Sequence, residues 1–277
     1  MDTFDLDFFI NQAKNGDLSA IYEVSSYYQK ENKYDLAFQY AYQGACRYYG
    51  PCERKLAYFY EKGIGTEKNY DMAIHYYNQA ISHGDIPSIT NLGIMYIRGL
   101  GLSKDEQKGF ELIKQAAEKD NFNALLTLAR LYHQGIGVEK DDSKYYEILT
   151  KLKDLGDRSS YHLIALCFYN GIGVAKDINK AFELMLSGAN DGDDECFYYL
   201  GTMFSKGEGC EKDPTRALYF YQQGAKSEDP RAMYNLALYY ENGIYVPKNE
   251  ELMLYWLNQA KKLDFQLAKE KLNELEK

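Results

Sequence analysis

Basic residues are scarce in this chain relative to acidic ones. Lysine and arginine together number 32 against 41 aspartates and glutamates, which gives a formal net charge of −9. A phosphate backbone and an anionic membrane surface are both bound mainly through Lys and Arg. The charge balance therefore disfavours nucleic acids and membranes as partners.

Long apolar stretches are missing too. No apolar run in the sequence approaches the ~18 residues of a membrane-spanning helix. The opening stretch MDTFDLDFFINQAKNGD is acidic where a secretory signal would be basic and then apolar. We therefore expect a soluble chain without an export signal, located in the cytoplasm.

The short motifs of common catalytic and metal sites do not occur. The sequence contains no nucleophile elbow, P-loop, His-Glu-x-x-His helix or Cys-x-x-Cys pair. The run Asp191-Gly-Asp-Asp-Glu195 lacks the alternating ligand spacing and the closing Glu of a calcium loop. We accordingly predict that the chain is not an enzyme and has no catalytic residues, no metal site and no cofactor.

What the sequence does contain is a repeat with a period of 36 residues. The phrase Gly-x-Gly begins at Gly63, Gly99, Gly135, Gly171 and Gly207, and one further step reaches Gly243-Ile-Tyr245. The same period relates an aliphatic column formed by Leu56, Leu92, Leu128, Ile164, Leu200 and Leu236. Length alone would suggest two domains of ~150 residues, but several columns at one period indicate a single repeat array.

Each repeat is predicted to form two helices. The first has small and apolar residues at positions i, i+1 and i+4, as in Leu92, Gly93 and Tyr96, which is a helical stripe. The leading Gly of each phrase suits the left-handed residue that ends a helix. Residues that cap helix starts form one column before the first helix and another before the second: Asp85, Asn121, Asp157, Asp193 and Asp229, then Asn69, Asp105, Asp141, Asp177, Asp213 and Asn249.

The two ends depart from the period, as the ends of a repeat array must. Residues 1–16 are predicted to form an N-terminal capping helix, and 17–49 a degenerate first repeat, because Tyr28 and Tyr60 are only 32 residues apart. Residues 50–263 hold six regular repeats, and 264–277 are predicted to form a C-terminal capping helix. The whole chain, 1–277, is thus expected to be one array.

These columns resemble the Sel-one-like repeat (SLR) family, which is related to the tetratricopeptide repeat. The residues that carry the resemblance are Ala232 to Gly243, residues 128 to 138 (Leu-Ala-Arg-Leu-Tyr-His-Gln-Gly-Ile-Gly-Val) and Ala73 to Ala80. The resemblance implies an all-α fold, an α/α superhelical solenoid of about seven 36-residue helix–turn–helix repeats with capping helices at both ends. It also implies that the first helices line a concave groove.

Two departures from the family pattern affect these expectations. Tyr245 replaces the second Gly of the phrase, so if that position needs a positive φ the last full repeat must use another loop conformation. In the cysteine-rich branch of the family, a disulfide between regularly spaced cysteines links the two helices of each repeat, but the five cysteines here do not have such a spacing. We expect five reduced thiols, consistent with a cytosolic location.

Candidate partner-binding residues lie beside the core stripe on the first helices. They vary from repeat to repeat while the core columns do not, which indicates a face tuned to a ligand. Tyr and Arg among aliphatic residues are typical of interface hot spots; the alternative is a solvated face with scattered tyrosines. The candidates are Tyr58, Arg98, Arg130, His133, His162, Tyr169, Tyr198, Lys206, Tyr234 and Glu241.

Two of these candidates could be read as metal ligands. On the tetratricopeptide pattern, His133 and His162 fall on the groove side of neighbouring first helices. A zinc pair would need a third Cys, Asp or Glu, and none is placed beside them. We interpret both as ordinary surface imidazoles.

The leading hypothesis is a non-enzymatic protein–protein interaction module, an adaptor or scaffold that holds a protein or an extended peptide in its groove. A sharper version follows from the resemblance, because some short, acidic bacterial family members are immunity proteins that neutralise a secreted toxin. The surplus of acidic residues would suit a basic toxin.

Three other classes stay open. The chain could be a secreted effector, or a hydrolase acting on β-lactams or cell-wall glycans, as claimed for some relatives. Enzymatic chemistry would need paired groove acids, but Glu61 and Glu241 are five repeats apart. The outer face of the array could instead drive self-assembly.

Overall fold

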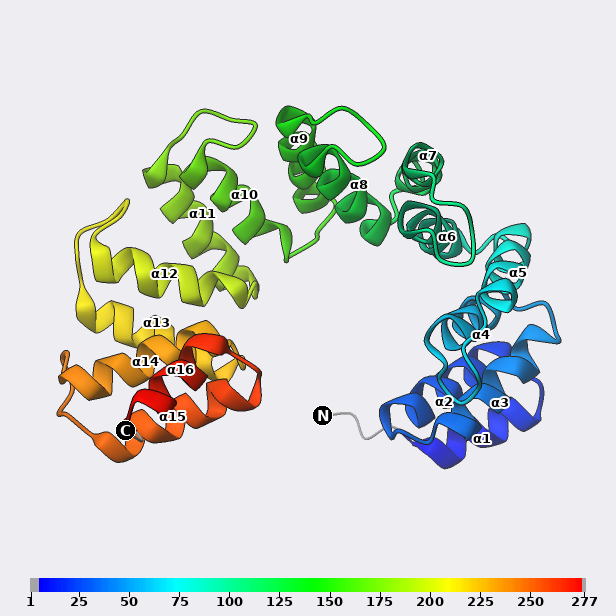
Figure 1. Cartoon of the computed structure of the whole chain (residues 1–277), viewed down its shortest axis with the longest axis horizontal. Coiled ribbons are helices and arrows are strands. Elements are labelled where there is room, and N and C mark those ends of the chain that lie inside the picture. Colours follow the sequence, from blue (N-terminus) through cyan, green and yellow to red (C-terminus); the bar gives the residue numbers. More distant parts are fainter. Residues whose placement is uncertain (1–4, 276–277) are drawn as a thin grey trace. The chain divides into compact units, whose positions relative to one another are not determined.

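The computed structural model describes residues 5–275, in which helices are joined by loops and no strand occurs (Figure 1). The helices are α1 (Leu6–Lys14), α2 (Leu18–Lys30), α3 (Tyr34–Ala45), α4 (Gly50–Lys62), α5 (Tyr70–Ser82), α6 (Ile86–Arg98), α7 (Glu106–Ala117), α8 (Phe122–Gln134), α9 (Asp142–Asp154), α10 (Ser160–Asn170), α11 (Ile178–Asp191), α12 (Glu195–Lys206), α13 (Pro214–Lys226), α14 (Pro230–Asn242), α15 (Glu250–Lys262) and α16 (Gln266–Leu275). The predicted all-α solenoid of about seven helix–turn–helix repeats is confirmed. No helix within 5–275 has both the length and the apolar character needed to cross a membrane.

The chain divides into two compact units, Met1–Asp141 and Asp142–Lys277. Unit 1 contains α1 to α8, and unit 2 contains α9 to α16. The division falls inside one 36-residue repeat, between its first helix α8 and its second helix α9. The prediction of capping helices corresponds to α1 at one end and α16 at the other, where Ala13, Ala268 and Leu272 are buried.

Most of the predicted helix boundaries are confirmed. The leading Gly of every phrase ends a first helix with a φ between 67° and 79°. Asp85, Asn121 and Asp229 accept hydrogen bonds from backbone amides in the first turn of the helices that follow them. The same holds before the second helices for Asn69, Asp105, Asp177, Asp213 and Asn249.

Two members of the first cap column are exceptions, and the prediction was wrong for them. The N-cap of α10 is Ser159, and Asp157 accepts a hydrogen bond from the Ser159 hydroxyl instead. The N-cap of α12 is Asp194, which makes no side-chain cap bond. Asp193 does not cap α12; its Oδ2 accepts two hydrogen bonds from His162, in the preceding first helix.

The expectation for the last loop was also wrong. The second Gly of each phrase packs tightly; at Gly173, for example, φ is +67° and a Cβ would lie 1.9 Å from the carbonyl oxygen of Asp142. Tyr245 nevertheless keeps a positive φ of 57° in the last repeat. The residue is 69% exposed, so the left-handed backbone conformation is retained at a cost in strain and without a packed side chain.

The helices of each unit form two layers. Within unit 1, α2 contacts α4 and α6 contacts α8; within unit 2, α12 contacts both α10 and α14. Comparable contacts between consecutive second helices are not found in residues 5–275. The first helices therefore form the inner, more closely spaced layer of each unit, and we call the exposed side of that layer the groove face.

Candidate functional site

In two repeats, a residue of the same column of the first helices contacts the next repeat. Arg54 in α4 donates from Nε to Asp85 at 2.9 Å, and His162 in α10 lies with Nδ1 2.9 Å from Asp193. Both pairs are 31 residues apart, and both carboxylates are almost fully buried. In these two repeats the side chain at this position therefore reaches a residue one or two positions before the next first helix.

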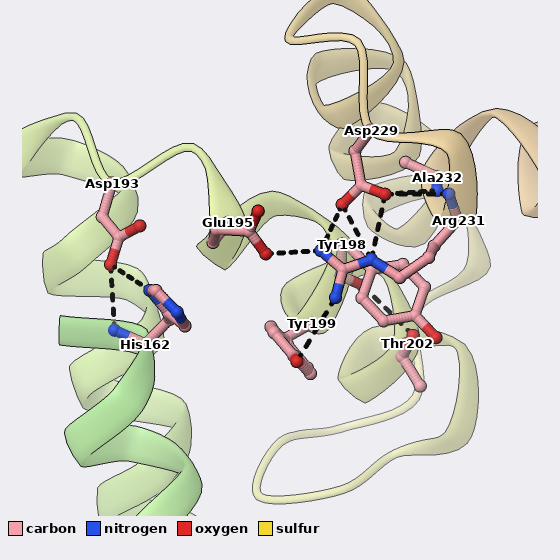
Figure 2. A network of polar contacts seen from close by, with 9 residues as sticks. All are labelled: His162, Asp193, Glu195, Tyr198, Tyr199, Thr202, Asp229, Arg231 and Ala232. Atoms are coloured by element: carbon pink, nitrogen blue, oxygen red, sulfur yellow. Dashed lines mark hydrogen bonds and ion pairs between the residues drawn. The ribbon is translucent and has the colours of Figure 1, made fainter. Parts of the chain in front are cut away.

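The His162–Asp193 contact lowers the pKa of Asp193 and joins His162 to the next repeat (Figure 2). Burial alone would raise the pKa of Asp193, but the hydrogen bonds from His162 and Cys196 outweigh it and hold the pKa below its ordinary value. His162 donates from its backbone amide as well, at 2.9 Å. Instead of being a free surface imidazole, His162 connects two repeats.

Arg231 is the centre of the neighbouring polar network in Figure 2. Its guanidinium donates to Asp229 at 2.6 Å and to Glu195 at 2.5 Å, and lies 4.5 Å from the centroid of the Tyr198 ring. Burial alone would lower the pKa of Arg231, but the two carboxylates raise it further above its ordinary value. Arg231 thus remains a cation that holds Tyr198 and Tyr199 against the start of α14.

Tyr198 and Tyr234 occupy the same column as His162, one and two periods later. The Tyr234 ring lies 5.8 Å from that of Phe265, which stands where the other repeats have their cap residue. Three of the predicted site residues therefore contribute to junctions between repeats as well as facing outward.

A pocket on the groove face of unit 2 contains two of the predicted residues. Its volume is about 260 Å³, and residues of α10, α11 and α12 line it. The Tyr169 hydroxyl donates to Glu208 at 2.7 Å, and this hydrogen bond raises the pKa of Tyr169, so the phenol stays protonated. We call it the tyrosine pocket; it is lined by Leu166, Tyr169, Asn170, Ala181, Met185, Tyr198, Tyr199, Thr202, Met203 and Glu208.

A second groove-face pocket lies in unit 1 and differs in charge. Its volume is about 490 Å³, and it contains the predicted residue Tyr58. No acidic residue lines it, whereas three cations do. We call it the cationic pocket; it is lined by Tyr22, Ser26, Gln29, Lys30, Arg54, Lys55, Tyr58 and Asn91.

A third pocket, of about 640 Å³, lies at the starts of the first helices of unit 2. Five carboxylates and two arginines line it. Asp193 and Asp229 are engaged as described above, whereas Asp194 and Glu228 are exposed. This rim of unit 2 therefore presents acidic side chains to solvent, and we call it the acidic rim.

The remaining predicted residues are more dispersed. Arg98 and Arg130 are exposed, and His133 is half-buried, at the ends of first helices in unit 1. In unit 2, the Lys206 Nζ lies 4.0 Å from Glu208, and Glu241 forms an ion pair of 2.8 Å with Lys271. The structure thus brings Tyr169 and Tyr198 together in one pocket, with Lys206 beside its Glu208, and leaves the others apart.

Nothing in residues 5–275 groups three or more potential metal ligands of the His, Cys, Asp and Glu types. The five cysteines are free, and burial raises the pKa of the Cys52 and Cys167 thiols to about 12. These two thiols are therefore protonated and unreactive near neutral pH.

Sequence reasoning missed several residues of these sites. Glu208 stands where the other copies of the phrase have Ile or Leu, and that exception to the column could have identified it. Lys55 carries no comparable signal, because its column already varies from repeat to repeat. Nor was the buried Glu53 predicted, which pairs with His83 at 2.8 Å, a residue that follows the second helix of the same repeat.

Comparison with known proteins identifies the repeat. The sequence model of the Sel1 repeat matches residues 50–85, 86–121, 123–157, 158–193, 197–229 and 230–265. A Sel1 repeat protein from Oxalobacter formigenes shares 30% identity over 87% of this chain and 96% of its own, with a TM-score of 0.70. The resemblance to the SLR family is therefore confirmed.

Two further solved structures show the same fold at lower identity. The protective antigen c5321 of uropathogenic Escherichia coli shares 23% identity with a TM-score of 0.69; the match covers 99% of this chain but only 59% of that one. The immunity protein PA5088 of Pseudomonas aeruginosa shares 15% identity over 73% of this chain and 76% of its own, with a TM-score of 0.50. None of the curated proteins matches the sequence.

Proposed function

The chain belongs to the Sel1 repeat family, and on that premise we propose that it is a non-enzymatic module that holds a protein or an extended peptide on its groove face. The Sel1 repeat is a protein-interaction fold. Where and how this chain binds its partner must come from its own pockets and charges.

The tyrosine pocket is the observation that carries the proposal. Tyrosine and methionine surround a space of about 260 Å³ with Glu208 at its edge, which suits one large side chain of a partner. Tyrosines in a partly desolvated pocket are the usual anchors of binding energy at interfaces. Because Tyr169 and Tyr198 are held by Glu208 and Arg231, little side-chain entropy would be lost on binding.

The chemistry of unit 2 favours a basic partner. Glu208 borders the tyrosine pocket, and Asp194 and Glu228 are exposed on the acidic rim. A lysine or arginine of the partner could place its aliphatic stem against the tyrosine rings and its charge near Glu208. We extend the proposal to an immunity protein that neutralises a basic toxin; PA5088 shares only the fold, so the support for this role is the charge of unit 2 and of the whole chain.

The chain provides a matched pair of variants for the test. Asn170 and Asn242 occupy the same column two periods apart, both are exposed, and each donates from Nδ2 to the carbonyl oxygen four residues earlier. Only Asn170 lines the tyrosine pocket. Asn170→Arg should therefore place a large cation at the pocket entrance, whereas Asn242→Arg should make the same local change elsewhere.

The full chain should be produced together with the basic proteins encoded beside it, and complexes isolated by size-exclusion chromatography. We expect one stoichiometric complex, with an affinity at least tenfold lower for Asn170→Arg and unchanged for Asn242→Arg. Reversing the charges of Arg98 and Arg130 together tests whether unit 1 contributes. Equal affinities for the two asparagine variants would exclude the tyrosine pocket as the binding site.

The alternative of a hydrolase is not favoured by any particular observation in residues 5–275. Glu241 is paired with Lys271, and the Glu61 Oε2 accepts a hydrogen bond from Tyr77 at 3.0 Å. A panel of β-lactam and cell-wall substrates would test this class directly. Turnover that is lost in a groove-face variant would overturn the proposal of a non-enzymatic module.

A further inference from the structure

The cationic pocket of unit 1 contains a buried ammonium group with an unusual set of partners. Lys55, in the first helix α4, is only 8% exposed, although lysines are usually exposed to solvent. Its Nζ donates to the Ser26 hydroxyl at 2.5 Å and lies 4.6 Å from the centroid of the Tyr22 ring. No carboxylate of residues 5–275 comes within ion-pair distance of it. A buried charge normally has an anionic partner, because removing it from water is costly.

The other charged groups around Lys55 leave the pocket positive. Arg54 and Lys30 line the same space, and both lower the pKa of Lys55, in addition to the larger effect of burial. Cys52 and Glu23 act in the opposite direction, but neither lines the pocket. Arg54 is balanced by Asp85, through its Nε only. Lys55 and Lys30 therefore have no acidic counterpart in the pocket.

We propose that the cationic pocket binds a carboxylate, presented by an aspartate or glutamate side chain of the protein partner. The pocket volume of about 490 Å³ admits one such side chain. Lys55 would provide the charge, and the amides of Gln29 and Asn91, which line the same space, would provide neutral donors. The rings of Tyr22 and Tyr58 would cover the methylene groups of the bound residue.

A carboxylate fits this donor set better than a phosphate group does. Phosphates are typically held by several arginine forks or by backbone amides at a helix start. Here the pocket has a single arginine, whose Nε is engaged with Asp85, and none of its lining residues lies in the first turn of a helix. The proposal rests on the proposed function only for the source of the carboxylate; the site itself can be tested without the partner.

The test uses the full chain labelled with 13C at the lysine ε carbons, with the Lys55 signal assigned from its loss in Lys55→Met. Three probes are titrated at constant ionic strength: a blocked tetraglutamate peptide, a blocked tetraglutamine peptide and inorganic phosphate. We expect a saturable shift of the Lys55 signal with tetraglutamate, at least fivefold larger than with tetraglutamine. The affinity measured at the Lys30 signal should fall at least fivefold in Lys55→Met.

Lys104→Met is the matched control, because Lys104 is an exposed lysine of the same unit, in a surface ion pair with Glu106. It should bind tetraglutamate as the unaltered chain does. Absence of a saturable shift at Lys55, or saturation by phosphate at a lower concentration than by tetraglutamate, would overturn the proposal. The asparagine variants of unit 2 test the proposed function separately, so failure of one does not imply failure of the other.

Discussion

Replacing Lys55 by methionine should make unit 1 more stable at neutral pH, contrary to the usual effect of altering a buried residue. Methionine retains most of the length and flexibility of lysine but removes the charge. The Tyr22 ring and the surrounding helices can pack against it as they do against the lysine stem. The gain arises because the folded protein no longer has to bury an ammonium group without an anion.

The size of the gain follows from the pKa of Lys55. Burial lowers this pKa from 10.5 to about 8. A tenfold change in the proton affinity of a group corresponds to ~1.4 kcal/mol, so burying the charged form costs about 3 kcal/mol at pH 7. Loss of the hydrogen bond to Ser26 removes about 1 kcal/mol of stabilisation. The expected net gain is therefore about 2 kcal/mol.

The pH dependence provides a second signature. Since the pKa of Lys55 is lower in the folded than in the unfolded chain, the unfolded state holds the proton more tightly. Stability of the unaltered chain should then rise as pH increases from about 8 toward 10.5. Lys55→Met should lack this rise, so its advantage over the unaltered chain should disappear before pH 10.5 is reached.

The free energy of local unfolding can be measured by native-state hydrogen exchange of the α4 amides, because repeats of a solenoid can unfold separately. Lys104→Met serves as the control and should change stability by less than ~0.5 kcal/mol. A destabilised Lys55→Met variant at pH 7, or an identical pH dependence in the two proteins, would refute the reasoning.

Three further predictions concern the contacts between and within repeats. His83→Ala should destabilise the chain by about 2 kcal/mol in urea unfolding, because it leaves the buried Glu53 without its partner. Adding Glu53→Leu to this variant should restore most of the lost stability. Additive effects of the two substitutions would contradict the pairing. His162→Leu should lower the free energy of unfolding by about 1 kcal/mol at pH 6. The difference from the unaltered chain should vanish as pH falls below ~3.9, because the lowered pKa of Asp193 stabilises the fold only while the carboxylate is charged. A difference that persists in acid would argue against this origin. Tyr245→Gly should raise the free energy of unfolding by about 0.5 kcal/mol, and with it the midpoint of thermal unfolding, because it relieves backbone strain. Tyr245→Ala keeps the strain and should not raise either quantity. Equal midpoints for the two variants would show that the loop is unstrained.

The pockets of the two units differ in charge. The cationic pocket lies in unit 1, and the acidic rim and Glu208 lie in unit 2. Complementary charge of both signs mainly sets specificity and the rate of association rather than raw affinity. A basic partner with one exposed acidic residue would satisfy both proposals.

The 36-residue period alone determined the helix pairs, their glycine ends and most of their caps, because these depend on local backbone chemistry that each repeat contains in full. Of the two exceptions, Asp157 is engaged locally by Ser159, whereas the other involves a contact between repeats. Asp193 has the sequence of a cap, but it is engaged by His162, which is 31 residues away. A rule based on neighbouring residues in the sequence cannot predict that contact.

The candidate site was predictable as a face but not as pockets. Periodicity placed Tyr169 and Tyr198 on the groove side of their helices, as the tyrosine pocket requires. Only the tertiary structure showed that Arg231 and Glu208 hold these rings, and that Lys55 is buried without an anion. The sequence specifies which residues each helix presents, whereas the packing of one repeat on the next decides which side chains are paired with each other and which remain for a partner.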